Sequence, residues 1–442
     1  MTTLIALGVL VIWWVPVFLK KTQGANMFLS CQTLFAIGFT LQFALPAIYF
    51  DYFPYYPDGY ADMTPLYPTV IYMPLIAGIP FFLLSIYDRG KINIVKNFTP
   101  DLITKGEKIP LSITILITIL FFGGLVGKYF MIKTGSFYHI YRTSYQFDYY
   151  EHYVIITILS DYFIISGLFL LAIGMKKRQS KSKYILFGYI ILIIELIFGI
   201  ISGKRRFVGQ LIIQYFTLRI ACGKIPRIFN FAIICLLFLL MVPVMEIYSG
   251  YVVTSNISES TLLGTKDLYD LYKSSKEAAE GYFTKIMFRF GDIRGASAAY
   301  STTPDMIDFQ YGQTYKYIPF FLIPRIIWPD KPDSRELANY TKIAMPSDPG
   351  SAPISWVCEG YLNFSWFGVF LIGCVMALIS RKLDNWLIPR VKAYIVFAVI
   401  WAYFSYNLIL VCYSMSYLVS EFLRLFIYFY PFYIISRFRV RP

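Results

Sequence analysis

Stretches of about 20 apolar residues recur along this chain, and short segments that carry lysine and arginine separate them. A soluble domain does not need such runs, because each of its helices presents an apolar stripe to the core and a polar face to water. Hydrophobic residues make up 57% of the 442 residues, and aromatic residues make up 19%. The pattern therefore predicts an all-α, polytopic membrane protein.

Allowing about 20 residues for each crossing, the sequence predicts about 11 transmembrane helices. They are expected over residues 3–19, 27–50, 66–87, 110–132, 153–175, 184–202, 207–221, 228–248, 366–380, 391–413 and 416–436. About eight of them fall within residues 1–248 and about three within residues 366–442. Residues 249–365 are expected to form one large extracytoplasmic loop with re-entrant or interfacial segments.

The distribution of cations orients these helices, because cytoplasmic loops carry an excess of lysine and arginine. Most cationic clusters fall on one side: Lys20-Lys21, residues 88–109, Lys176–Lys183, Lys224 with Arg227, residues 381–392 and the tail at 437–441. That side is predicted to be the cytoplasm, so the N-terminus lies outside and the C-terminus inside. Clusters between apolar runs also explain the net charge of +14 without nucleic acid as a partner.

One cationic turn breaks the rule. Lys204, Arg205 and Arg206 lie between the runs 184–202 and 207–221, at a place where this topology predicts the outside of the membrane. Cations held on that face are explained by an anionic ligand. Pairing with loop carboxylates or with lipid phosphates is the other explanation.

The predicted external loop contains a proline-rich segment at residues 323–332, which includes Trp328. The prolines exclude a regular helix and fix an irregular backbone, and tryptophan is suited to the membrane interface. Arg325 and Lys331 are thereby expected near membrane level.

Four short patches resemble the Wzy-type O-antigen and oligosaccharide repeat-unit polymerases. They are Pro-Arg-x-x-Trp-Pro-x-Lys-Pro at 324–332, Arg-Phe-Gly-Asp at 289–292, Gly-Lys-Arg at 203–205 and Glu-Gly-Tyr-Leu-Asn-Phe at 359–364. The resemblance implies a GT-C-like glycosyltransferase that joins polyprenyl-pyrophosphate-linked repeat units into a polymer. It also implies an active site under the extracytoplasmic loop.

The residue types in these patches suit that chemistry. Negative charge builds on the departing diphosphate, and arginine presents a planar fork that matches phosphate oxygens. The pyrophosphate is expected to bind to Lys204, Arg205, Arg206 and Lys331, and the predicted catalytic residues are Arg289, Asp292, Arg325 and Glu359. Asp292 or Glu359 would accept the proton of the acceptor hydroxyl. Glu359 is also placed to cap a helix that begins near Tyr361.

Glu195 lies in the middle of the predicted span 184–202, where an unpaired carboxylate is costly, so it must face protein or water. A proton relay and a structural partner such as a tyrosine hydroxyl both remain open. No spacing of histidine, cysteine or carboxylate residues predicts a metal site, and no cofactor is expected.

The sequence is thus interpreted as a polysaccharide polymerase of the bacterial plasma (inner) membrane. Its expected partners are polyprenyl-pyrophosphate-linked oligosaccharides, membrane lipid, a chain-length regulator and a flippase. Two alternatives remain: a ligase that transfers finished polymer to another acceptor, and a transporter or flippase of lipid-linked sugars. The transporter would be expected to show repeat symmetry and broken helices.

Overall fold

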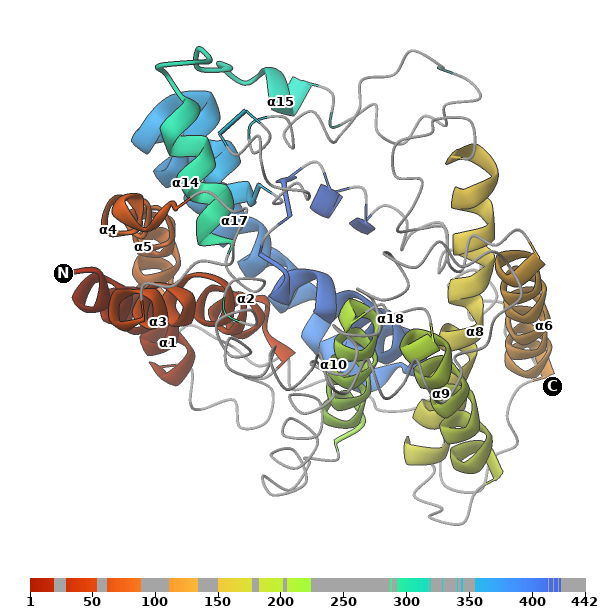
Figure 1. Cartoon of the computed structure of the whole chain (residues 1–442). Helices are drawn as coiled ribbons and strands as arrows, with labels where there is room; N and C mark the ends of the chain where they lie inside the picture. The colour runs from red at the N-terminus through yellow and green to blue at the C-terminus, as the bar shows by residue number, and fades with distance from the viewer. Residues whose placement is uncertain are drawn as a thin grey trace. The chain divides into compact units, whose positions relative to one another are not determined.

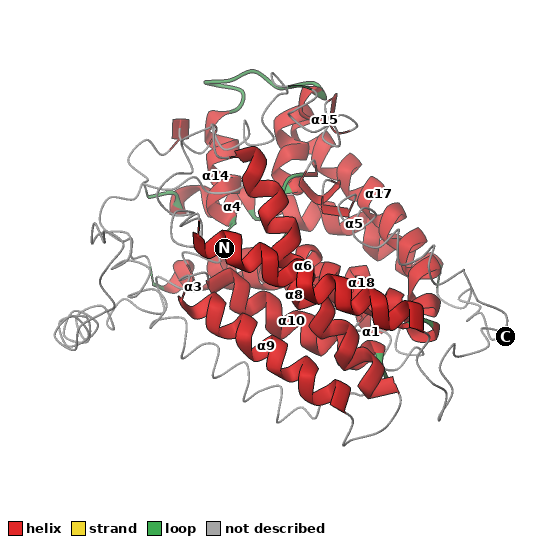
Figure 2. Ribbon diagram, turned by 90° about the vertical axis from the view of Figure 1, so that its right-hand side faces the viewer, coloured by secondary structure: helices red, strands yellow, loops and turns green. Residues whose placement is uncertain are grey.

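In this computed structural model, the described part of the chain consists of helices joined by loops and turns and contains no strand, as Figure 2 shows. The structure describes residues 1–19, 29–53, 62–88, 111–133, 150–176, 183–201, 205–223, 292–316, 354–411, 413–415, 417–419 and 421–422, with 287, 318, 328, 340 and 343–344. Seven helices in these ranges are long and apolar enough to cross a membrane. An all-α protein with several membrane spans is therefore confirmed.

Seven of the expected spans correspond to those helices: Thr2–Leu19, Cys31–Tyr52, Thr64–Tyr87, Ile113–Lys133, Ile158–Lys176, Lys183–Ile200 and Trp356–Val391. The expected spans 207–221 and 391–413 correspond to shorter apolar helices, Phe207–Ala221 and Ile395–Ile409. The span 228–248 and most of 416–436 lie outside the described residues. The total of about 11 stays a prediction.

The chain forms two compact units, each assembled from separate stretches of sequence. Unit 1 comprises residues 1–98, 283–389 and 404–427, and unit 2 comprises residues 99–282, 390–403 and 428–442. Helix α18 (Ile395–Ile409) is divided between them: its first part belongs to unit 2 and its end to unit 1.

Unit 1 is built around the N-terminal helices seen in red and orange in Figure 1. They are α1 (Thr2–Leu19), α2 (Cys31–Phe39), the π-helical turn η2 (Thr40–Ala44), α3 (Leu45–Tyr52), the 3₁₀ turn η3 (Thr64–Leu66), α4 (Tyr67–Val70) and α5 (Tyr72–Tyr87). The later stretches add α14 (Ile293–Thr302), α15 (Gln313–Lys316) and most of α17 (Trp356–Ala393).

Aromatic side chains join these elements into one core. The fully buried Trp13 stacks on Phe39 with ring centroids 4.3 Å apart, and its indole N–H donates to the carbonyl of Pro74 at 2.9 Å. Phe39 and Phe35 also lie 5.6 and 5.8 Å from the ring of Trp356. The start of α17 is therefore anchored on α2, and this contact positions the residues that follow Trp356.

Helix α17 is interrupted at Phe364 and Ser365, whose backbone dihedrals are not helical; Ser365 has a φ of 56°. Residues 356–363 form a short helix before this break, inside the segment that the sequence assigns to the external loop. The two parts then approach backbone to backbone, because a Cβ atom on Gly360 would lie 2.8 Å from the carbonyl oxygen of Gly368. Such a close crossing requires glycine at both positions.

Unit 2 consists of α6 (Leu111–Lys133), α8 (Tyr150–Lys176), α9 (Lys183–Ile201), α10 (Arg205–Ala221) and the first part of α18. Helices α6 and α8 lie side by side in Figure 1, and α8 packs in turn against α9. The backbone of Gly127 meets that of Ser160, so α6 and α8 touch without intervening side chains. Small residues are the usual means of such packing in membranes.

The close approach of Gly360 and Gly368 in α17 leads to a prediction about the stability of a variant. Gly368→Ala would place a methyl group on the carbonyl oxygen of Gly360, so we expect a loss of about 1–3 kcal/mol and a lower melting temperature in detergent. Gly8→Ala is the matched control, because its added methyl would only make ordinary contact, 3.4 Å from Leu75. Equal melting temperatures for the two variants would contradict the crossing.

Candidate functional site

Two of the predicted catalytic residues, Asp292 and Glu359, lie in unit 1 with described side chains. Arg205 and Arg206 begin α10 in unit 2, but their side chains are outside the described part of the structure. Four other predicted residues also lie outside it: Lys204, Arg289, Arg325 and Lys331. The structure therefore describes a site around the two carboxylates.

Asp292 directly precedes α14 and is 4% exposed. Although it occupies the capping position, its side chain makes no capping hydrogen bond, and neither carboxylate oxygen has a partner among the described residues. Burial raises the pKa of Asp292 to about 8, while the nearby Ser355 hydroxyl lowers it by a smaller amount. Asp292 is thus a buried acid that is mostly protonated at neutral pH.

Glu359 is fully buried one turn into α17. One of its oxygens, Oε2, accepts a hydrogen bond of 2.6 Å from the backbone N–H of Met415, whereas Oε1 has no partner among the described residues. A carboxylate at the N-terminus of the helical residues that begin at Met415 is favoured by the exposed amides there.

The expectation that Glu359 caps a helix beginning near Tyr361 is wrong. The helix begins five residues earlier, at Trp356, and Ser355 precedes it with an Oγ that accepts from the N–H of Cys358 at 3.3 Å. The serine therefore performs the local capping. Glu359 is left to bind an element distant in sequence.

The loop after α14 is fastened to the break in α17. Asn363 donates to Thr314 Oγ1 at 2.7 Å and accepts from the N–H of Gly312 at 2.8 Å. The N–H groups of Gln310 and Tyr311 donate to the carbonyls of Leu362 and Asn363, at 2.9 and 3.1 Å. These bonds satisfy carbonyls that the interrupted helix leaves open and hold residues 310–316 beside Glu359.

Tyr315 lies in the loop that is held beside Glu359. Its hydroxyl is buried and has no geometric hydrogen-bond partner among the described residues, and burial, together with the nearby Glu359, raises the pKa of Tyr315 well above its usual value. Several other buried polar atoms of unit 1 are unpaired within the described residues: both Oδ atoms of Asp292, Thr303 Oγ1, Trp356 Nε1 and Glu359 Oε1. Buried polar groups are normally paired, so this concentration points to a polar ligand or water.

An aromatic cluster, formed by Tyr300, Phe309, Tyr311, Tyr361 and Trp366, lies beside these groups. The Tyr361 ring is 5.3 Å from Trp366, 5.6 Å from Tyr300 and 6.1 Å from Phe309. The Tyr361 hydroxyl donates to the carbonyl of Thr303 at 3.4 Å. Tyr311, which adjoins Phe309, is 73% exposed. The cluster thus extends from the buried Tyr361 to the surface.

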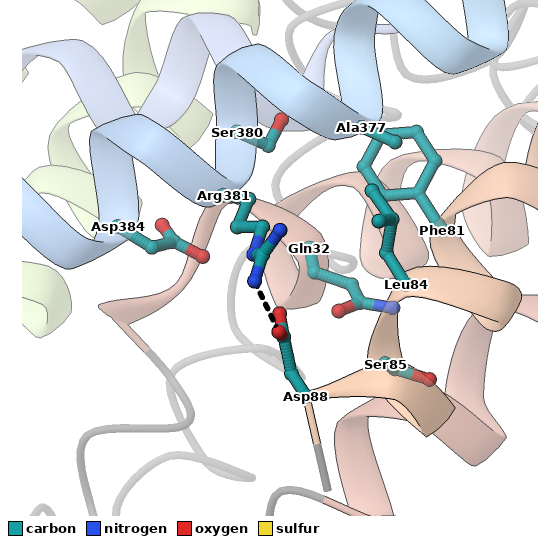
Figure 3. Close-up of a pocket in the computed structure, with 9 residues that line it drawn as sticks. All are labelled: Gln32, Phe81, Leu84, Ser85, Asp88, Ala377, Ser380, Arg381 and Asp384. Atoms are coloured by element: carbon teal, nitrogen blue, oxygen red, sulfur yellow. Dashed lines mark hydrogen bonds and ion pairs between the residues drawn. The ribbon is translucent and has the colours of Figure 1, made fainter. Parts of the chain in front are cut away.

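A polar pocket elsewhere in unit 1 has a structural explanation. Figure 3 shows it between α2, α5 and α17. Its lining consists of Gln32, Phe81, Leu84, Ser85, Asp88, Ala377, Ser380, Arg381 and Asp384. Arg381 pairs with Asp88 at the end of α5, and Asp384 accepts the first N–H of α2, from Cys31, at 2.8 Å. Asp384 thus stabilises the N-terminus of α2, and the Arg381–Asp88 pair links α17 to the end of α5, so these contacts connect three helices.

In unit 2, Glu195 pairs with a residue that the sequence analysis did not consider. Lys128 of α6 donates to Glu195 Oε2 at 2.8 Å, in place of the tyrosine hydroxyl suggested as a structural partner. The signal was present, since Lys128 interrupts an apolar run in the same way as Glu195 does. Opposite charges in neighbouring spans are expected to find each other.

A family model described as a domain of unknown function (DUF8712) matches residues 137–388. No curated protein and no solved structure matches the chain.

The raised pKa of Asp292 leads to a prediction about how stability depends on pH. Asp292 keeps its proton up to a pKa of about 8 in the folded protein, while the unfolded chain releases it near 3.8. Folded wild-type protein should therefore lose stability, relative to Asp292→Asn, as the pH rises from about 4 to about 8, by at most about 1.4 kcal/mol per pH unit. Above pH 8 the difference should stay constant.

Melting temperatures in detergent between pH 4 and pH 9 measure this difference. Asp305→Asn is the control, because Asp305 is an exposed carboxylate in the same unit. A pH-independent difference between wild-type protein and Asp292→Asn would show that Asp292 is solvated.

Proposed function

We propose a function for this chain, which belongs to the DUF8712 family of domains of unknown function, from the geometry of unit 1. The function is that of a glycosyltransferase which polymerises polyprenyl-pyrophosphate-linked oligosaccharide repeat units at the outer face of the bacterial plasma membrane. The observation that carries it is the set of buried carboxylate oxygens on Asp292 and Glu359 that have no described partner, in the same unit as the aromatic cluster.

A saccharide fits both parts of this site. Its hydroxyl groups donate hydrogen bonds, and Glu359 Oε1 and the oxygens of ionised Asp292, which have no described partner, accept them. Its ring carries an apolar face that packs on aromatic side chains, which the cluster from Tyr361 to Tyr311 offers. A few convergent polar groups within an otherwise apolar site fix the orientation of such a ligand.

In the proposed reaction, a hydroxyl oxygen of the acceptor sugar attacks the anomeric carbon of the donor. The bond between that carbon and the diphosphate breaks, and its electron pair leaves with the lipid diphosphate. Asp292 accepts the hydroxyl proton, because a pKa of about 8 lies near the working pH. Glu359, held by Met415, orients the acceptor through Oε1.

The diphosphate that leaves requires positive charge nearby. In this proposal Lys204, Arg205, Arg206 and Lys331 bind the pyrophosphate, and Arg289 and Arg325 stabilise the charge that develops. The start of α10 at Arg205 supports the first part, because backbone N–H groups and the helix dipole at an N-terminus favour phosphate. The sequence pattern at 289–292 and 324–332 supports the second. No cofactor is invoked.

A ligase that moves finished polymer to another acceptor would use the same groups. A transporter of lipid-linked sugars is the second candidate, and one observation favours it. The helices around Glu359 are interrupted, at 364–365 and again between Ile409 and Met415, and transporters commonly build substrate sites from such discontinuous helices. In the polymerase, the proposed partners are a flippase that delivers the lipid-linked unit and a chain-length regulator.

The arginines provide the first test. Purified protein supplied with a lipid-linked repeat unit should produce a ladder of longer saccharides, and Arg289→Ala or Arg325→Ala should reduce it about 100-fold or more. Lys382→Ala, an exposed cation on α17, should leave the ladder unchanged. Single addition to a foreign acceptor would favour the ligase, and movement across the membrane without new bonds would favour the transporter. Full ladders from both arginine variants would remove them from the site.

The carboxylates provide the second test. The wild-type rate should rise with pH and level off above about 8, because only ionised Asp292 accepts a proton. Asp292→Asn should lower the rate about 100-fold and lose this pH dependence. Asp305→Asn should keep both. An unchanged pH profile in Asp292→Asn would assign the base to another residue.

A further inference from the structure

The Lys128–Glu195 pair in unit 2 has a feature that packing alone does not explain. The lysine is 8% exposed and lies inside a membrane span, with its ammonium group 2.8 Å from Glu195 Oε2. Removing two charges from water costs as much as their attraction returns, so apolar residues of the same volume would serve stability equally well. A buried charge pair within a membrane is by default a candidate for function.

The position of the pair connects it with the cationic turn. Lys128 precedes the end of α6 at Lys133 by five residues, and Glu195 precedes the end of α9 at Ile201 by six. Both therefore lie about 8 Å along the helix from the ends of α6 and α9. Helix α10 begins at Arg205, only four residues beyond Ile201.

Phe207 provides the direct link. Its ring centroid lies 5.5 Å from the ammonium nitrogen of Lys128, and the ring packs so closely on Gly199 that a Cβ atom there would come within 2.7 Å. Phe207 is one residue from Arg206. Lys128 thus lies against the first turn of α10, which already carries two arginines.

Lys128 and Glu195 each have hydrogen-bonding capacity that no described residue uses. An ammonium group has three N–H donors, and Glu195 is the one hydrogen-bond acceptor found for Lys128 in the described residues. Phe198 and Phe207 cover the group through their ring faces, at 5.2 and 5.5 Å. Glu195 Oε1 is buried and has no described partner. Among the described residues, a single hydrogen bond, to Glu195 Oε2, restrains the lysine.

We propose that Lys128 is a further phosphate-binding residue: it exchanges Glu195 for an oxygen of the lipid diphosphate when that ligand reaches the start of α10. The inference rests on the proposed function. Glu195, with Asp161 close by, neutralises Lys128 while the site is empty. Asp161 itself accepts a hydrogen bond of 2.8 Å from the Tyr403 hydroxyl. Arg205 and Arg206 supply the additional positive charge that a diphosphate needs.

Binding of farnesyl diphosphate to the full-length protein in detergent tests the proposal, with farnesol as the uncharged control ligand. The double variant Lys128→Met, Glu195→Gln removes both charges while keeping side chains of similar size. It should bind about tenfold more weakly than wild-type protein, as expected for the loss of one charged hydrogen bond. Glu195→Gln alone should bind at least as tightly as wild type, because it frees the lysine.

The matched control is Lys133→Met, because Lys133 is an exposed lysine on the same helix; this variant should bind farnesyl diphosphate like wild-type protein. A double variant that binds like wild-type protein, or a Glu195→Gln variant that binds more weakly, would show that the pair is structural only and overturn the proposal. The ladder assay separates this result from failure of the proposed function. If wild-type protein and the double variant both produce the ladder, the role of Lys128 is overturned and the proposed function is not. If binding of farnesyl diphosphate depends on Lys128 but wild-type protein produces no ladder, the proposed polymerase function is overturned and the role of Lys128 is not.

Discussion

The hydrogen bond from the Met415 N–H to Glu359 is the interaction on which the rest of unit 1 depends. It joins the short helix before the break in α17 to the chain that resumes after α18, two elements 56 residues apart. The neighbouring bond from the Trp356 N–H to the carbonyl of Tyr413, at 2.9 Å, runs between the same two segments. Without the carboxylate, the partly buried N–H of Met415 would lose this described partner, which costs about 1–3 kcal/mol. The loop at 310–316 is bonded to the same short helix, so three separate stretches of the chain meet there.

The same constraint governs unit 2. Within a span, a charge persists where a partner compensates for the lost water, and Lys128 and Glu195 are partners of this kind. In unit 1, the oxygens of Asp292 and Glu359 that have no described partner suit the hydroxyl groups of a sugar. In unit 2, the ammonium group of Lys128 has one hydrogen-bond acceptor among the described residues, and an ammonium group suits phosphate.

Sequence reasoning predicted the helices well because each membrane span must bury about 20 apolar residues, a signal that is local. The break at Phe364 and Ser365 could not be predicted in this way, since the acceptors left open there are satisfied by residues 310–314, far away in the sequence. The sequence indicated Asp292 and Glu359 as candidates, but it did not predict that they are buried or that Glu359 accepts a hydrogen bond from Met415. Lys128 was missed because spans were judged by mean apolarity, which one lysine scarcely alters.

The two carboxylates of unit 1 are unlike each other in a way that assigns their roles. Glu359 has one oxygen fixed by an amide of the backbone, so its orientation is set before a ligand arrives. Asp292 has neither oxygen fixed and is stable in the protonated form, because burial disfavours its charge. A group that must take up a proton during a reaction needs the second kind of environment, and a group that must hold an acceptor in place needs the first. The asymmetry follows from Asp292 preceding α14 without capping it, whereas Glu359 caps a distant helix start.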